Sequence, residues 1–191
     1  MWRFRDLHKG ETCLLLGNGP SLNDTPINGY PSIGSNTIVK SNLKPTYYVA
    51  IDTRVMREYG DAADELRIPI FVPQPDLDDW EDVYRFWHRP VPLWPSDLEA
   101  GIDFECVMHA QMQIAYYMGF ERMLIVGMDH TLASTQHFWG KDEGMRGSPD
   151  ADKMAEGYKE LREGMDVEML NLSPYTELDE EYIPRDDWKK W

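Results

Sequence analysis

The chain has 191 residues, of which 42% are hydrophobic, and its 34 Asp and Glu against 19 Lys and Arg give a net charge of −15. This length predicts one domain, residues 1–191, with a sizeable core. The acidic balance argues against nucleic acid and anionic membranes as partners, because both favour a basic face. No apolar run approaches the roughly 20 residues of a membrane span, and the N-terminus lacks the apolar region of a signal peptide. We therefore expect a cytoplasmic protein.

Strand-like and helix-like segments alternate along the chain. This pattern predicts an α/β protein with a Rossmann-like, mostly parallel sheet, right-handed crossovers and helices on both faces. The predicted strands are 13–16, 31–39, 46–51, 68–73, 123–126 and 167–170. The predicted helices are 55–66, 77–87, 104–118 and a segment that starts after Asp150 or Asp152 and ends near Glu163.

Two segments fit no regular element. Residues 131–150 form a polar loop that is too long for a plain connection, so we predict a functional segment, such as a reduced lid. Residues 179–191 form a tail that is first acidic and then basic. We expect this tail to pack on the body of the protein or on a partner, and the sequence leaves that choice open, as it does the oligomeric state.

The most informative stretch is the one that ends the first predicted strand. The apolar residues 13–16 are followed directly by Gly17-Asn18-Gly19-Pro20-Ser21. Glycine allows a sharp turn and a close approach of the backbone to a ligand. Ser21 could cap a short helix after the turn. A strand, a glycine-rich turn and a helix start together predict an anion site, usually for a phosphate.

Polar residues also follow four other predicted strands at their carboxyl ends. In open α/β sheets, ligands bind at this edge. The complete predicted set consists of Gly17, Asn18, Gly19 and Ser21, then Asn36, Asp52, Gly127 and Asp129, and finally Asn171 and Ser173.

The long loop adds two histidines to this edge. His137 is the first candidate for a general base or a leaving-group acid, and His130 is the second, because the ordinary pKa of histidine lies near working pH. Asp129 and these histidines match no known metal-ligand spacing, so we expect no metal site. The two cysteines, Cys13 and Cys106, are expected to be core or near-core residues without a disulfide.

Several known motifs are absent. The sequence has no G-x-S-x-G elbow of a hydrolase and no P-loop. The full dinucleotide-binding motif is also missing, because Leu22 stands where the third glycine belongs.

Four blocks of the sequence resemble the bacterial sialyltransferases that use CMP-activated sialic acid. The opening Leu15-Leu16-Gly17-Asn18-Gly19-Pro20-Ser21-Leu22 and the segment from Ala115 to Asp129, which ends in Gly127-Met128-Asp129, are similar to the most specific motifs of that family. Ser35-Asn36 and Asn171-Leu172-Ser173-Pro174 resemble two further motifs. The opening and the G-x-D block also resemble the archaeal-type 6-hydroxymethyl-dihydropterin pyrophosphokinases.

This resemblance implies a nucleotide at the first-strand turn, with Asn36 beside the base or the sugar. His137 lies where the family has a tyrosine that helps to hold the donor phosphate. The family's catalytic histidine would fall in Gly147-Ser148-Pro149-Asp150, which contains no histidine, and this chain is also shorter in the region of the family's lid.

The sequence thus leaves three hypotheses. The first is a small glycosyltransferase-like enzyme that binds a nucleotide or nucleotide-sugar and needs no cofactor. The second is a pyrophosphokinase-type transferase that uses Mg²⁺ held by Asp52 and Asp129. The third is a nucleotide-binding or interaction module without catalytic activity.

Overall fold

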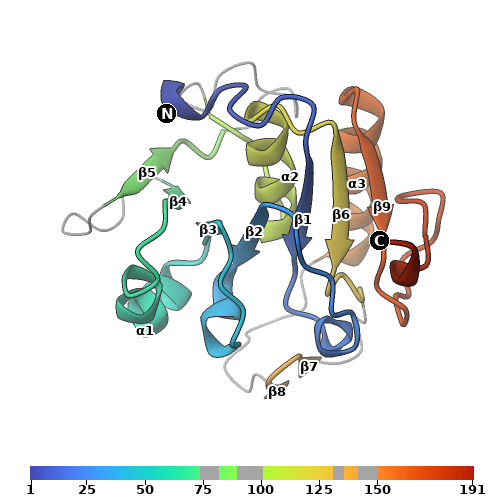
Figure 1. The fold of residues 1–191 in the computed structure, drawn as a ribbon, viewed down its shortest axis with the longest axis horizontal. Coiled ribbons are helices and arrows are strands. Elements are labelled where there is room, and N and C mark those ends of the chain that lie inside the picture. The colour runs from blue at the N-terminus through green and yellow to red at the C-terminus, as the bar shows by residue number, and fades with distance from the viewer. Residues whose placement is uncertain (74–81, 90–100, 131–135, 142–149) are drawn as a thin grey trace.

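A seven-stranded parallel sheet forms the centre of the protein (Figure 1), in a computed structural model that describes residues 1–73, 82–89, 101–130, 136–141 and 150–191. The strand order is β5-β4-β3-β2-β1-β6-β9, and all six neighbouring pairs are parallel. The predicted α/β fold with a parallel sheet is therefore confirmed. The strands are β1 (Thr12–Leu16), β2 (Ser32–Ser35), β3 (Tyr47–Val49), β4 (Ile70–Pro73), β5 (Val83–Phe86), β6 (Arg122–Val126) and β9 (Glu168–Asn171).

The remaining elements are helices and one small hairpin. The α-helices are α1 (Thr53–Asp64), α2 (Val107–Tyr117) and α3 (Ala151–Gly164). The 3-10 helices are η1 (Trp2–Phe4), η2 (Pro20–Asp24), η3 (Asn36–Lys40) and η4 (Trp188–Lys190). Strands β7 (Gln136–His137) and β8 (Gly140–Lys141) pair in antiparallel fashion and form a hairpin within the predicted lid segment.

The helices cover both faces of the sheet because alternate strand residues point to opposite sides. In β1, Cys13 and Leu15 belong to the core cluster that contains α2 and α3, whereas Leu14 and Leu16 belong to the cluster that contains α1. Figure 1 shows α2 and α3 together near β1, β6 and β9, with α1 apart from them at the β3 and β4 end.

The order of the strands reverses next to β1. Strands β2 to β5 lie on one side of β1, and the chain then crosses to the other side of β1 to form β6 and β9. A reversal of this kind places a binding crevice at the carboxyl ends of the two strands that flank it. The arrowheads of β1 and β6 point toward the end of the molecule that carries the β7–β8 hairpin (Figure 1).

Most predicted elements are confirmed to within three residues, but two predictions are wrong. The predicted strand 31–39 ends at Ser35, because Asn36 adopts a φ of 44° and starts η3. The predicted helix 77–87 is wrong over Val83–Phe86, which is strand β5. Pairing with β4 and burial of Phe86 in the core favour the extended backbone there, and residues 77–81 lie outside the described part of the chain.

The tail packs on the body of the protein. Asn171 N donates to Pro184 O at 2.8 Å, and Asp186 N donates to Asn171 O at 3.2 Å, so the tail continues the hydrogen bonding beside β9. Ile183 is fully buried. Among the described residues, no helix is both long and apolar enough to cross a membrane.

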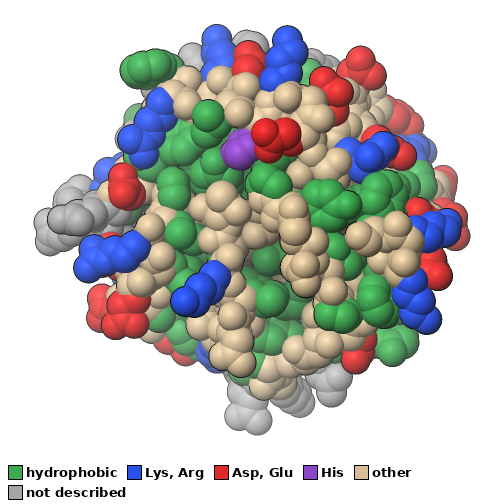
Figure 2. Space-filling view, viewed as in Figure 1, with side chains coloured by type: hydrophobic (Ala, Val, Ile, Leu, Met, Phe, Trp, Pro, Cys, Tyr) green, Lys and Arg blue, Asp and Glu red, His purple; other side chains and the backbone are tan. Residues whose placement is uncertain are grey.

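Charged groups are unevenly distributed over the surface. In Figure 2, hydrophobic and uncharged polar atoms make up the middle of the face shown, and most Asp and Glu side chains lie toward its edges.

Candidate functional site

Two turns meet at the carboxyl ends of β1 and β6. Residues 17–21 follow β1, and residues 127–129 follow β6. Gly17 N donates to Val126 O at 2.8 Å, and Gly19 N donates to Gly127 O at 2.9 Å. The predicted residues Gly17, Gly19, Gly127 and Asp129 are therefore brought together, and the two turns join the strands that flank the reversal of the sheet.

The glycines allow this close approach of the two turns. A Cβ on Gly17 would lie 2.4 Å from Gly127 O, and a Cβ on Gly19 would lie 2.3 Å from Asp129 Oδ2. Gly127 has a φ of 72°, a conformation that glycine adopts without strain. The glycines of the opening motif thus serve the contact between the turns.

The side chain of Asp129 binds the backbone of the first turn. Its Oδ2 accepts a hydrogen bond from Ser21 N at 2.8 Å, and the residue is only 4% exposed. Ser21 was expected to cap the helix, but Gly19 occupies the N-cap position of η2 and Pro20 follows it. The cap prediction is wrong because proline is well suited to the first helical position, which moves the cap one residue back.

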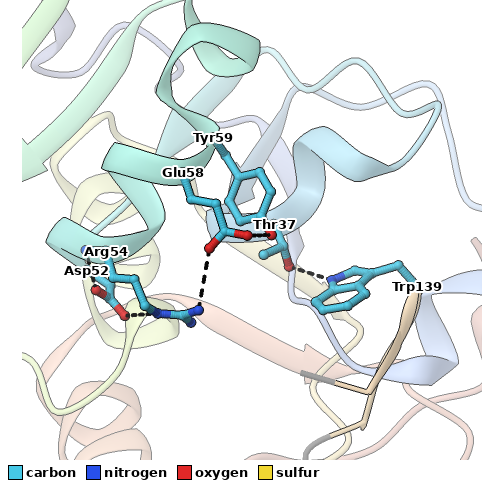
Figure 3. Close-up of polar contacts among 6 residues, drawn as sticks. All are labelled: Thr37, Asp52, Arg54, Glu58, Tyr59 and Trp139. Atoms are coloured by element: carbon cyan, nitrogen blue, oxygen red, sulfur yellow. Dashed lines mark hydrogen bonds and ion pairs between the residues drawn. The ribbon is translucent and has the colours of Figure 1, made fainter. Parts of the chain in front are cut away.

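The hairpin lies over the ends of β1 and β2. Phe138 N donates to Asn18 O at 2.9 Å, and Trp139 Nε1 donates to Thr37 Oγ1 at 2.9 Å. Thr37 Oγ1 in turn donates to Asn18 Oδ1 at 2.9 Å. Figure 3 shows the indole of Trp139 directed at Thr37. The hairpin of the segment 131–150 therefore lies at this edge, whereas residues 131–135 and 142–149 lie outside the described residues. A functional role of the segment stays a prediction.

The side chain of Asp52 caps the helix that follows it, α1. Its Oδ1 accepts from Arg54 N at 2.7 Å, so it is the N-cap of α1. The guanidinium of Arg54 lies between Asp52 and Glu58, at 3.9 Å and 3.6 Å (Figure 3). In this arrangement the carboxylate of Asp52 carries a capping role and an ion pair.

The side chains of Asn171 and Ser173 hydrogen-bond the backbone of the second turn. Ser173 Oγ accepts from Met128 N at 2.9 Å, and Asn171 Nδ2 donates to Met128 O at 3.3 Å. Both side chains are buried. These two predicted site residues therefore hold the backbone of residues 127–129 in place.

Four buried polar atoms at this edge have no hydrogen-bond partner in the structure. Five such side-chain atoms occur among the described residues, and only Gln113 Oε1 lies elsewhere. Gln111 belongs to the set because its Nε2 donates to Leu16 O and Ile33 O beneath the edge. Most buried polar groups in proteins are hydrogen-bonded, so a cluster of exceptions needs an explanation. The four atoms are Ser21 Oγ, Asn36 Oδ1, Gln111 Oε1 and Asp129 Oδ1.

The two candidate histidines lie in different surroundings. His130 follows Asp129 with a φ of 52°, and its ring centroid is 6.0 Å from that of Tyr158. Burial lowers the pKa of His130, with a further lowering from nearby His109 and an opposing effect of Glu177. His137 lies in β7 and stacks on Trp139 with the ring centroids 5.4 Å apart. The structure thus places His130 at the end of β6 and His137 on the hairpin.

A second group of reactive side chains lies at the start of α2. It consists of Cys106, His109 and Tyr158, with a Cys106 Sγ to Tyr158 Oη distance of 3.2 Å. The sequence predicts Cys106 as a core or near-core residue and gives no role to His109 or Tyr158. A cysteine and a histidine three residues apart at a predicted helix start was the signal that could have found this pair.

A cavity lies beside the edge, and none of the predicted site residues is among its described lining residues. Its volume is about 760 Å³, and it extends from Leu16 and Val126 of the sheet to Phe138 and Trp139 of the hairpin. Among its described lining residues are Lys40 and Lys44 and no Asp or Glu. Among the described residues, no group of three or more His, Cys, Asp or Glu could hold a metal ion.

We expect Asp129→Ala to lower the free energy of unfolding by about 1–3 kcal/mol, because Ser21 N would lose its acceptor inside the protein. Asp129→Asn keeps an oxygen for the same N–H, so it should lose less than half as much. Urea unfolding of the three proteins measures the difference. Equal losses in the two variants would show that the bond to Ser21 does not join the turns.

No known family model matches the sequence, and no curated protein matches it. Among solved structures, the fold is similar to that of the sialyltransferase CST-II, whose crystal structure contains a trisaccharide acceptor and CMP. The TM-score is 0.57 with 11% sequence identity, and the match covers 88% of this chain and 83% of that chain. The chain therefore has a sialyltransferase-like, Rossmann-like fold.

Proposed function

We propose that the chain binds a nucleotide or nucleotide-sugar at the carboxyl ends of β1, β2 and β6 and transfers the activated group, as a glycosyltransferase-like enzyme. The observation that carries this proposal is the cluster of four buried polar atoms without partners at this edge. Leaving such an atom without a partner costs about 1–3 kcal/mol. A ligand that supplies the missing hydrogen bonds would recover that cost.

The conformation of Asn36 supports the same place. Its φ of 44° is uncommon for residues other than glycine, and residues held in such conformations cluster at functional sites. Tyr48 Oη donates to Asn36 O at 2.6 Å and fixes this backbone. The side chain of Asn36 is thereby held at the end of β2, where its Oδ1 has no partner.

The chemistry of the four atoms indicates which part of the ligand faces them. Asn36 Oδ1, Gln111 Oε1 and Asp129 Oδ1 accept hydrogen bonds, and only Ser21 Oγ can also donate. The N–H groups of Gly17, Gly19 and Ser21 already donate within the protein. We infer that ribose hydroxyls or a base amino group face this edge, and that the phosphate lies away from Asp129.

A ligand reaches these covered atoms when a covering segment moves. The hairpin is attached to the edge by three hydrogen bonds between described residues, from Phe138 N to Asn18, from Asn23 to Phe138 O, and from Trp139 to Thr37. A ligand that enters would break these bonds, and the hairpin could then close over it, as loops close over substrates in many enzymes. The hairpin would in this way serve as the predicted reduced lid.

The comparison with CST-II supports the choice of ligand class. That protein binds CMP on a fold similar to this one. The Mg²⁺-dependent alternative would need Asp52 and Asp129 as metal ligands, but Asp52 already accepts from Arg54 N and forms an ion pair with the guanidinium of Arg54, which leaves Asp129 Oδ1 as the free oxygen of this pair. Binding without transfer is the remaining alternative, and kinetics separates it from the proposal.

We expect CMP or a CMP-sugar to raise the thermal stability of the protein, by about 2.7 kcal/mol at a concentration of 100 Kd. Thermal shift with CMP, CTP, CMP-sugars and ATP, each with and without Mg²⁺, measures this. Asn36→Gly should abolish the shift, because glycine keeps the φ and removes the side chain. Asn42→Gly, on the wall of the 760 Å³ cavity, is the matched control.

No shift with any of these nucleotides would contradict the proposal. Loss of the shift in Asn42→Gly with retention in Asn36→Gly would move the site to that cavity. A shift that appears only with ATP and Mg²⁺ would favour the pyrophosphokinase-type alternative.

We propose His130 as the general base and expect the acid limb of the rate profile to fall below pH 6.5, because burial lowers its pKa and keeps the ring neutral to lower pH. His130→Gln should reduce kcat by about 10²–10⁴-fold. Release of nucleotide from the nucleotide-sugar that binds is the measurement, with His137→Gln as the matched variant. A full loss in His137→Gln with little change in His130→Gln would reverse the assignment.

A further inference from the structure

The cavity of about 760 Å³ beside the edge lies among three separate segments of the chain. Residues between 22 and 32 and residues 40–44 form two of its sides, and the β7–β8 hairpin contributes Phe138 and Trp139. Leu16 and Val126 reach it from β1 and β6, on the face of the sheet that α1 covers. The volume lies within the range of about 300–1,000 Å³ that is typical of small-molecule sites.

The cavity is aliphatic in its buried part and polar at its opening. Leu16, Leu22 and Val126 are buried and form the floor of the cavity, and Ile27 and Phe138 are half-buried. The exposed lining residues mark the opening, and most of them are polar. They include Asn28, Lys40, Asn42 and Lys44. A ligand in this cavity would therefore place an apolar part on the floor and a polar part at the opening.

The charged groups at the opening are positive. No described lining residue is Asp or Glu, although the chain contains 34 of them. Among the described residues, no ion pair joins Lys40 or Lys44 to a carboxylate. Lys40 Nζ instead lies 3.3 Å from the ring centroid of Trp139 and 4.7 Å from that of Tyr59. These rings carry no net charge, so the positive charge of Lys40 is not neutralised.

The loop that carries the two lysines is held in a defined conformation. Ser41 Oγ donates to Ile38 O at 2.7 Å and accepts from Leu43 N at 3.1 Å. These bonds tie residues 41–43 to the end of η3, so that Lys40 and Lys44 both remain at the opening. A site that is already formed before the ligand arrives costs less free energy to occupy than one that must first be ordered.

The buried polar groups of the lining are already bound within the protein. Thr25 Oγ1 donates to Ser21 O at 2.6 Å, and Ser32 Oγ accepts from Thr46 N at 3.3 Å. A nucleotide base in the buried part would lose hydrogen bonds to water and find few partners there, whereas an aliphatic chain has no such bonds to lose. The lining thus favours an aliphatic ligand over a second nucleotide.

We propose that this cavity binds a small amphipathic anion, an aliphatic carboxylate of medium chain length. The chain lies on the floor formed by Leu16, Leu22 and Val126, and the carboxylate lies at Lys40 and Lys44. Burial of the chain supplies most of the affinity, and the lysines select the charge of the head group. The proposal does not depend on the proposed nucleotide site, so each can fail without the other.

The experiment titrates the full chain with decanoate in a calorimeter at low salt, and we expect one ligand per chain. Decanoate should bind about ten-fold more tightly than octanoate, because two further CH₂ groups leave water. It should also bind more tightly than decanol or decylamine, which is cationic at pH 7, by up to about five-fold for each lysine that it contacts. Equal affinity for the three head groups, or for the two chain lengths, would overturn the proposal.

Variants at the opening then test the location. Lys44→Gln removes a positive charge, and Asn42→Asp adds a negative one without a change of shape, so each should weaken decanoate by about two- to five-fold and leave decanol unchanged. Lys153→Gln is the matched control, because it changes the net charge equally but lies in α3, on the other face of the sheet. Wild-type affinity in both variants, or an equal loss in Lys153→Gln, would contradict the proposal.

A competition experiment separates this cavity from the proposed nucleotide site. CMP should not displace decanoate from the wild-type protein or from Asn36→Gly, which lacks the side chain proposed to bind the nucleotide. Displacement by CMP in Asn36→Gly would assign the cavity to the nucleotide and overturn the proposal. Binding of several decanoate molecules that Lys44→Gln does not weaken would also overturn it, because that result indicates adsorption to the apolar surface.

Discussion

The contact between the turns after β1 and β6 is the constraint on which the rest of the edge depends. The carboxylate of Asp129 binds Ser21 N, and the absence of a Cβ on Gly17 and Gly19 lets the two backbones approach. A helix start that would otherwise attract a phosphate receives its anion from the protein itself. The opening motif therefore builds the contact between the turns, and a ligand of the proposed site would contact the side chains around it.

This division changes what the edge can recognise. The backbone N–H groups of residues 17, 19 and 21 donate within the protein. Side-chain oxygen atoms of Asn36, Gln111 and Asp129 remain without partners. Such an edge selects for hydrogen-bond donors, which the sugar and base of a nucleotide carry and its phosphate lacks. The specificity of the proposed site thus comes from the neutral end of the ligand, which is consistent with an acidic chain.

The parallel sheet is predictable from the sequence because each buried strand is a short apolar run, and the cap of α3 is narrowed to Asp150 or Asp152, of which the structure uses Asp150. Strand β5 is not, because the spacing of Tyr84 and Trp87 imitates a helix while the pairing with β4 is a long-range contact. The sequence predicts where the candidate site lies, but it does not predict which residues contact one another there. Nothing local to Gly19 shows that Asp129, 110 positions later, fills the space beside it.

His130 connects the contact between the turns to the chemistry beside it. It follows Asp129 directly, Glu177 N holds Asp129 O at 2.8 Å, and the ring of His130 faces Tyr158, which bonds Cys106. A ligand that draws Asp129 Oδ1 into a new hydrogen bond therefore acts on the backbone that places His130. Binding at the edge and protonation of His130 should thus be coupled, and by linkage each must change the free energy of the other by the same amount.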